Sequence, residues 1–196
     1  MSELTNFQQI QHTVSIVIPV YLGSQTLRPL IEEIQPFITP CRSPRGIEFL
    51  VTEVVLVNDC GPDKSENVIR ELSQRFDWIK PVWLSKNFGQ HAATLAGMAA
   101  TTSEWIITID EDGQQNPKDF GNLLDTAIEN DASLVYAKPT NRPPHGVIRN
   151  TFSWIVKNTI FRMLTDGSHR NFNSFRLVSG AVGRTLAAYV GDGVYL

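Results

Sequence analysis

The stretch that decides the fold is "VSIVIPV", Val14–Val20, a short and almost entirely apolar run. A run of this length, rich in β-branched residues, is typical of a strand that is buried on both faces, as strands of parallel sheets are. A helical pattern follows in "TLRPLIEEI", Thr26–Ile34, where apolar residues recur three and four positions apart. The two segments together predict a strand followed by a helix that packs on its sheet.

The same unit recurs along the chain. Further strands are expected at 51–57, 79–85, 104–110 and 132–138, with helices at 62–76, 89–100 and 117–129 between them. Strands that alternate with helices of 10 to 15 residues predict βαβ units. We therefore expect an α/β fold, a mainly parallel sheet with helices on both faces.

Unusual polar residues follow each predicted strand. In sheets of this kind, ligands bind beyond the carboxyl ends of the strands. The segments at those ends are Pro19 to Tyr21, Asn58 and Asp59, Ser85 to Gly89, and Asp110 to Gln115. We expect one crevice to collect all four.

Three carboxylates end the fourth strand, in "WIITIDEDGQQNP", Trp105–Pro117. If this strand end is extended, Asp110 and Asp112 project to one side and Glu111 to the other. Two oxygen ligands with an open coordination shell suit Mg²⁺ or Mn²⁺ shared with substrate phosphates, where the ion would neutralise a departing pyrophosphate. The alternative is a helix cap or a solvated turn, and the position after a buried strand favours the metal.

Two further segments point to ligand binding. Asp59 at the second strand end can accept hydrogen bonds from a base or a ribose, although Asn58 or Asp59 could instead shape the turn. "NFGQHAATLAG", Asn87–Gly97, predicts a helix whose free N–H groups face the crevice.

Composition excludes several classes of protein. The chain has 196 residues, of which 42% are hydrophobic and 19% charged, as in an ordinary globular domain. No apolar run is long enough to cross a membrane, and Cys41 and Cys60 lack metal-ligand spacing, which suits a reducing cytoplasm. A dehydrogenase would need Gly-x-Gly-x-x-Gly after a strand, and a nucleotidyltransferase a glycine-rich basic loop after the first strand; neither occurs.

Charge is unevenly distributed. The net charge is −3, yet residues 139–196 hold 7 Lys and Arg against 2 Asp and Glu. Such a basic segment indicates contact with phosphate, of a nucleotide, a lipid or a membrane surface. A solvated basic face is the alternative, and no nucleic-acid partner is expected.

Five motifs in order extend this interpretation: "SIVIPVY", "EVVLVNDCGPDKS", "LSKNFGQHAATLAGM", "ITIDEDGQQNP" and "NSFRLVS". Together they resemble the motifs of inverting glycosyltransferases of family two, especially the branch of polyprenyl-phosphate sugar synthases. The resemblance runs from about Val14 to Val178. It implies a GT-A fold, a hexosyltransferase activity, a UDP- or GDP-linked sugar donor, and Mg²⁺ or Mn²⁺.

The resemblance also implies roles for residues. Asp59 would hold the nucleoside, Asp110 and Asp112 the metal and the diphosphate, Gln114 a further metal contact, and Arg176 a phosphate. The residues expected to act in catalysis are Asp110, Asp112 and Arg176. The expected donor site consists of Pro19, Tyr21, Asp59, Asn87, Gly89, Asp110 and Arg142.

One difference from the family's motifs bears on the nature of the acceptor. Some members of the family carry an acidic residue, proposed for catalysis, where this chain has Ser174, and serine is no general base at neutral pH. A polyprenyl phosphate is already ionised, since the second pKa of a phosphate monoester is about 6, and it can attack without a base. A sugar hydroxyl in polysaccharide synthesis would need Glu111, Asp192 or a residue beyond Leu196; a non-catalytic nucleotide-sugar-binding module is the remaining alternative.

Two regions of one domain are expected. Residues 1–138 form the nucleotide-sugar-binding half, and residues 139–196 an acceptor-side segment that is truncated at its C-terminus. The resemblance implies transfer at the cytoplasmic face of a membrane. Trp154 and Phe161, among cationic residues on one face of a predicted helix, suit peripheral contact with lipid headgroups. The alternative is that they pack under a loop.

Overall fold

The computed structural model describes residues 11–137 and 174–189. Its strands are β1 (His12–Val20), β2 (Cys41–Arg42), β3 (Glu48–Asn58), β4 (Ile79–Trp83), β5 (Trp105–Thr108), β6 (Leu134–Tyr136) and β7 (Arg176–Ser179). Its helices are α1 (Leu27–Ile34), α2 (Ser65–Arg75), α3 (Gln90–Ala99), α4 (Phe120–Glu129) and α6 (Gly180–Tyr189), with the 3-10 turns η1 (Gln35–Ile38) and η2 (Pro117–Asp119). Within this part of the chain, one sheet has the order β2-β3-β1-β5-β7-β6, and β4 pairs with β3.

Strand β1 lies in the middle of the sheet. It pairs in parallel with β3 on one side and with β5 on the other, and β3 pairs in parallel with β4. Every residue from Val14 to Val20 is buried, as the continuous apolar run predicts for a strand covered on both faces. The predicted α/β fold with a mainly parallel sheet is confirmed.

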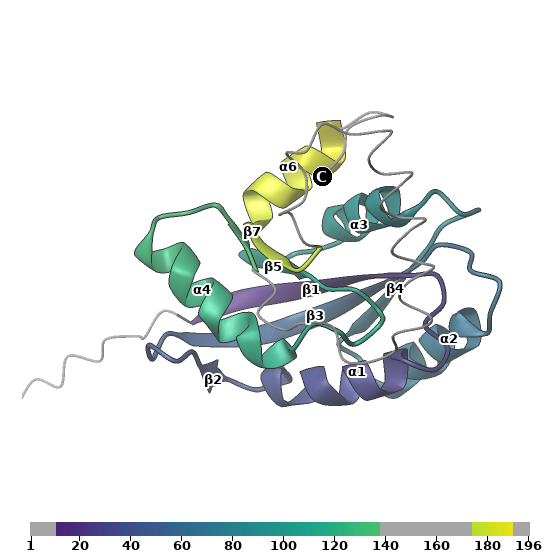
Figure 1. The fold of residues 1–196 in the computed structure, drawn as a ribbon, viewed down its shortest axis with the longest axis horizontal. Coiled ribbons are helices and arrows are strands. Elements are labelled where there is room, and N and C mark those ends of the chain that lie inside the picture. Colours follow the sequence, from purple (N-terminus) through teal and green to yellow (C-terminus); the bar gives the residue numbers. More distant parts are fainter. Residues whose placement is uncertain (1–10, 138–173, 190–196) are drawn as a thin grey trace, which may run out of the picture.

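Helices cover both faces of the sheet (Figure 1), with α1, α2 and α4 on one side and α3 and α6 on the other. Alternate residues of β1 point to opposite faces. Ile16 and Ile18 join the apolar cluster under α1, α2 and α4, while Val17 joins the smaller cluster that includes Ala93 and Met98 of α3. The chain therefore buries one apolar layer on each face of the sheet. Because β1, β3, β4 and β5 pair in parallel, they all end at the same edge of the sheet.

One edge of the sheet differs from the simplest reading of the sequence. Strand β6 follows β5 in the chain, yet it does not pair with it. Strand β7 lies between them and runs antiparallel to both, so that Thr108 and Tyr136 each pair with Arg176. Strand pairing between segments that are distant in the chain is a tertiary property, which the sequence pattern does not reveal.

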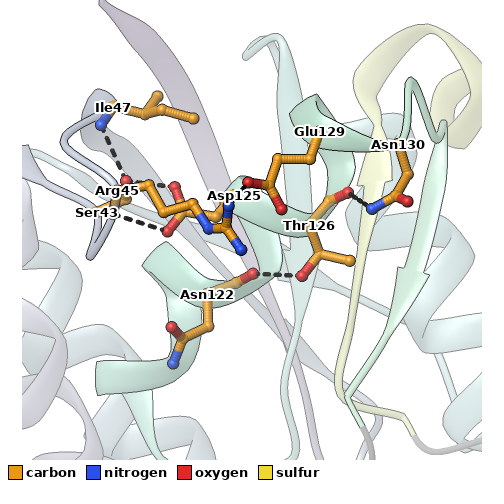
Figure 2. A network of polar contacts seen from close by, with 8 residues as sticks. All are labelled: Ser43, Arg45, Ile47, Asn122, Asp125, Thr126, Glu129 and Asn130. Atoms are coloured by element: carbon orange, nitrogen blue, oxygen red, sulfur yellow. Dashed lines mark hydrogen bonds and ion pairs between the residues drawn. The ribbon is translucent and has the colours of Figure 1, made fainter.

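A buried carboxylate fastens the β2–β3 turn to α4 (Figure 2). Asp125 Oδ1 accepts a hydrogen bond of 2.5 Å from Ser43 Oγ, and Oδ2 accepts one of 3.1 Å from Arg45 N. Arg45 also forms an ion pair with Glu129. The turn precedes β3, so this network lies at the opposite end of the sheet from the strand ends that carry the predicted ligand site. We regard it as structural.

Candidate active site at the carboxyl ends of the parallel strands

Backbone hydrogen bonds hold the predicted strand ends side by side. Asp59 N donates to Val20 O at 2.8 Å, Ile109 N donates to Val17 O at 3.1 Å, and Leu84 N donates to Asn58 O at 3.1 Å. These bonds continue the parallel pairing just past the strands. The structure thus brings together the four segments that follow the predicted strands.

The carboxylate of Asp110 accepts hydrogen bonds from three side chains. Oδ1 accepts from Gln90 Nε2 of α3 at 2.6 Å, and Oδ2 accepts from Gln115 Nε2 at 2.8 Å and from the hydroxyl of Ser174. Burial raises the pKa of Asp110, and the charge of Asp112 raises it further, whereas the hydrogen bonds from Ser174, Gln115 and Gln90 oppose the rise. The carboxylate is fixed in place before any ligand arrives.

Gln115 is a site residue that sequence reasoning missed. Its Oε1 accepts from Asp110 N at 2.8 Å, while its Nε2 donates to Asp110 Oδ2 and, at 2.9 Å, to Ser174 Oγ. The predicted metal contact, Gln114, has an exposed side chain. Nothing in the sequence distinguishes two neighbouring glutamines, because only the course of the turn decides which one faces Asp110.

Glu111 faces the loop between β1 and α1. Oε2 accepts from Tyr21 N at 2.9 Å, and Oε1 accepts from Leu22 N at 2.8 Å. Burial raises the pKa of Glu111, the two N–H groups oppose this rise, and the negative charges of Asp63 and Asp112 add to it. Glu111 and Asp110 thus have different partners, and the expected projection of Asp110 and Asp112 to one side stays a prediction.

The reason given for that expectation is wrong, because the acidic residues do not lie in an extended strand. Strand β5 ends at Thr108, and the chain turns at residues 111 and 112. Asp112 is exposed in this turn, where its Oδ1 accepts from Gln114 N at 3.0 Å, and Gly113 has a φ of 68°. The charge of Asp112 still reaches Asp110, since it raises the pKa of that carboxyl.

The residues present fit a metal that is shared with a substrate. In residues 11–137 and 174–189, no three His, Cys, Asp or Glu side chains are grouped so that they could hold a metal ion by themselves. Asp110 and Asp112 supply carboxylate oxygens on one turn. Mg²⁺ and Mn²⁺ accept a few protein oxygens when phosphate oxygens and water complete the shell.

Asp59 directly follows β3 and is only 3% exposed. Its Oδ1 accepts from Phe88 N at 2.7 Å and its Oδ2 from Gly89 N at 2.9 Å; Asn87 Oδ1 also accepts from Gly89 N at 2.9 Å. Two N–H groups just before α3 are thus bound to side chains of the chain itself, and a ligand contact of the N–H groups within the first turn of α3 stays a prediction. The contact of Asp59 with a nucleoside remains a prediction. Its alternative role, to shape the local chain, is supported by its hydrogen bonds to Phe88 N and Gly89 N.

The β1–α1 loop places the other predicted donor contacts. Pro19 is buried within β1, and Tyr21 is 40% exposed at its end. Gly61, after β3, lies so close that a Cβ there would overlap the carbonyl oxygen of Tyr21. This close approach requires glycine and packs the ends of β1 and β3 together.

Arg176 is buried, with 6% of its surface exposed. Its neighbours Phe175 and Leu177 point to the α4 face and Val178 to the α3 face, so Arg176 points to the α3 face beside the end of β5. Its guanidinium lies 6.0 Å from the centre of the Tyr136 ring. The other expected residues Arg142, Trp154, Phe161 and Asp192 lie outside the described residues.

A family model described as "Glycosyl transferase family 2" matches residues 15–185. The match spans most of the chain, and the protein belongs to this family. Within the described residues, no helix has both the length and the apolar character needed to cross a membrane.

Two curated relatives with the same name are similar to this chain in sequence. The chain is 35% identical over 125 residues to an undecaprenyl-phosphate 4-deoxy-4-formamido-L-arabinose transferase of Edwardsiella ictaluri, which covers 63% of this chain and 36% of the relative. It is 32% identical over 171 residues to the transferase of the same name from Photorhabdus laumondii, which covers 87% of this chain and 48% of the relative. The chain thus spans less than half the length of these relatives.

Solved structures agree on the fold. Staphylococcus aureus TarS 1-349 has a TM-score of 0.60 at 15% identity, over 94% of this chain and 52% of that one. Glucosyl-3-phosphoglycerate synthase from Mycobacterium tuberculosis, in complex with Mn²⁺, UDP and phosphoglyceric acid, has a TM-score of 0.54 at 18% identity, over 87% and 57%. The mannosyltransferase PcManGT from Pyrobaculum calidifontis, with GDP-Man and Mn²⁺, has 0.54 at 16% identity, over 66% and 36%. The predicted GT-A fold is confirmed.

Proposed function

We propose that this chain carries the donor site and the catalytic residues of a glycosyltransferase that moves a sugar from a nucleoside-diphosphate sugar to a polyprenyl phosphate. Family membership supports the reaction class. The names of the curated relatives, transferases that act on undecaprenyl phosphate, support the acceptor.

The choice of a phosphate acceptor rests on one observation: the site's buried and half-buried carboxylates already accept hydrogen bonds from the protein itself. In the part of the chain that the structure describes, Asp59 and Glu111 each accept two backbone N–H groups, and Asp110 accepts three side-chain donors. Ser174 donates its hydroxyl to Asp110, so it is no base. A site that holds these three carboxylates in this way, with the exposed Asp112 assigned to the metal, suits a nucleophile that is already ionised, as a phosphate is at neutral pH.

The donor side uses Asp110 and Asp112. These carboxylates would hold Mg²⁺ or Mn²⁺ together with the diphosphate of a UDP- or GDP-linked sugar, and the ion would supply positive charge against the leaving group. The complexes of PcManGT with GDP-Man and Mn²⁺ and of the mycobacterial synthase with UDP and Mn²⁺ have comparable ligands. Gln90, Gln115 and Ser174 keep Asp110 oriented for this task.

Arg176 would act on the leaving group. An acceptor phosphate oxygen attacks the anomeric carbon and forms the new bond, while the bond from that carbon to the donor diphosphate breaks and the nucleoside diphosphate leaves with the electron pair. A buried guanidinium beside the end of β5 stabilises that negative charge strongly, because little water competes there. Arg142 would be a further cation, and configuration inverts because there is one displacement.

The place of action follows from the acceptor. A polyprenyl phosphate is held in a membrane, so the reaction would occur at the membrane surface, on the cytoplasmic side where nucleotide sugars are supplied. Peripheral contact of the chain with that surface is part of the proposal.

Donor binding is tested first by calorimetric titration. UDP and GDP are each titrated into the protein with Mn²⁺ and with EDTA, and into Asp112→Ala and Asp77→Ala. Asp77 is exposed in the turn between α2 and β4, far in the sequence from the acidic turn, and serves as the matched control. We expect one nucleotide to bind only with metal, at least about tenfold more weakly to Asp112→Ala and unchanged to Asp77→Ala. Full binding by Asp112→Ala would refute the metal assignment.

The acceptor is tested separately. The full-length protein is given the donor sugar with undecaprenyl phosphate, or with an oligosaccharide that offers only hydroxyls. Transfer to the phosphate alone is the expected result. Transfer to the hydroxyl alone would show that a base exists and that the acceptor assignment is wrong.

A further inference from the structure

We propose that Glu111 is a positioning residue, which sets the affinity for the sugar donor by fixing the β1–α1 loop without touching the donor. This inference rests on the proposed function. The sequence places Glu111 between the two predicted metal ligands and makes it a candidate base for a hydroxyl acceptor. The structure gives it a different task.

The contact itself is a two-point clamp. Each carboxylate oxygen of Glu111 accepts one of two successive backbone N–H groups, from Tyr21 at 2.9 Å and from Leu22 at 2.8 Å. Both oxygens are therefore used by the loop, and charge-assisted hydrogen bonds of this kind are among the stronger ones in proteins. The clamp joins segments about 90 residues apart in the chain.

The same loop is held from its other side by the start of α2. Gly23 N donates to Ser65 Oγ at 2.8 Å, and Ser24 N donates to Asp63 Oδ2 at 3.0 Å. Four successive N–H groups, from Tyr21 to Ser24, thus have side-chain acceptors. Glu111 is the one acceptor among these that comes from the acidic turn.

Close packing leaves the clamp little freedom. A Cβ on Gly23 would lie 2.7 Å from Glu111 Oε2 and 2.9 Å from Leu27 Cγ, so this position must stay bare for the carboxylate to reach the loop. The negative charges that act on Glu111 are those of Asp63 on the α2 side and of Asp112 on its own turn. The clamp holds against this repulsion through its two N–H donors.

The consequence concerns Tyr21, a predicted donor contact that is 40% exposed at the loop. Because Glu111 lies between Asp110 and Asp112 in the chain, the loop with Tyr21 and the turn that holds the diphosphate keep a fixed separation. A nucleoside and its diphosphate need both at once. Release of the clamp should weaken donor binding more than it slows the chemical step.

The test compares Glu111→Gln with wild type and with Glu33→Gln, a change at an exposed glutamate of α1. A glutamine keeps one acceptor oxygen and places an NH₂ group against the other N–H. We expect amide hydrogen exchange at Tyr21 and Leu22 to become about tenfold faster in Glu111→Gln. The donor KM should rise about three- to tenfold while kcat stays within about twofold, and Glu33→Gln should match wild type.

Two results would overturn the inference. Unchanged exchange at Tyr21 and Leu22 would show that the clamp does not hold the loop, and a fall in kcat at constant KM would show that Glu111 acts in the chemical step. Gly23→Ala disturbs the same contact from the loop, because its Cβ would lie 2.7 Å from Glu111 Oε2. This change should also raise the donor KM. If the wild-type protein binds no nucleotide, the proposed function fails, whereas the exchange comparison still decides whether the clamp exists.

Discussion

Ser174, just before β7, donates its hydroxyl hydrogen to Oδ2 of Asp110, which lies 64 residues earlier in the chain. The bond exists because β7 pairs with β5, and Asp110 follows shortly after the end of β5. It joins the expected acceptor-side segment, residues 139–196, to the predicted metal site. A serine at this position therefore orients a carboxylate of the predicted metal site.

The two glutamines of the acidic turn should behave differently. Gln115→Ala removes three hydrogen bonds around Asp110 and Ser174, whereas Gln114→Ala removes an exposed side chain. We expect Gln115→Ala to lower the free energy of unfolding by about 1–3 kcal/mol and Gln114→Ala by less than about 0.5 kcal/mol. Urea denaturation measures both, and equal losses would show that Gln115 does not organise the turn.

The predicted contact of Gln114 with the metal can be tested separately. If it contacts the metal, Gln114→Ala should weaken Mn²⁺-dependent nucleotide binding while stability stays unchanged. Calorimetry on the same protein samples decides this, and unaltered affinity would remove Gln114 from the predicted site.

Asp59→Asn should loosen the start of α3. An asparagine can accept only one of the two N–H groups that Phe88 and Gly89 direct at the buried carboxylate, and its NH₂ group would face the other. Hydrogen bonds to a charged group contribute about 1.5–3 kcal/mol, so thermal unfolding should show a loss in this range. Asp77→Asn is the control at an exposed position, and a loss no larger than that of the control would contradict the structural role.

The stability of the metal-free protein should depend on Asp110 and on pH. Burial raises the folded-state pKa of Asp110 above the ordinary 3.8, so the folded state binds the proton more readily than the unfolded state does. This carboxyl therefore lowers the free energy of unfolding as pH rises from 3.8 up to the raised value. Asp110→Asn removes the titration.

The measurement is Tm against pH, from about pH 4 to about pH 7, for wild type and Asp110→Asn with EDTA present. The difference, variant minus wild type, should become more positive as pH rises. Two curves with a constant offset would show that Asp110 has the same pKa in both states.

Arg176→Lys should affect transfer more than folding. Lysine keeps the charge but lacks the planar fork that binds two phosphate oxygens. We expect kcat/KM for the donor sugar to fall about tenfold or more, while Tm changes little. Arg184→Lys, which alters an arginine of α6 whose Nη1 donates to Ser103 O at 2.9 Å, is the control. An equal effect of the two changes on kcat/KM would remove Arg176 from the leaving-group site.

Most of the fold could be predicted from the sequence because it is encoded locally. The apolar run Val14–Val20 and the strand-helix rhythm after it predict a parallel sheet, and the structure has β1, β3, β4 and β5 in parallel. The two-residue strand β2 gave no such signal, because so short a strand has no periodicity of its own. The course of the turn at Asp112 was also missed, since the alternation expected for a strand ends at Thr108.

By itself, the sequence determined that carboxylates follow buried strands. Because parallel strands end at one edge of the sheet, the acidic turn and Asp59 had to lie at that edge. Only the tertiary structure decided how these carboxylates divide their tasks. Glu111 binds the β1–α1 loop, Asp59 binds the start of α3, and Asp110 takes Gln115 and Ser174 as partners. The physical reason is that hydrogen-bond partners are chosen by which distant backbone and side-chain groups packing brings within about 3 Å, and the order of residues along the chain does not state that.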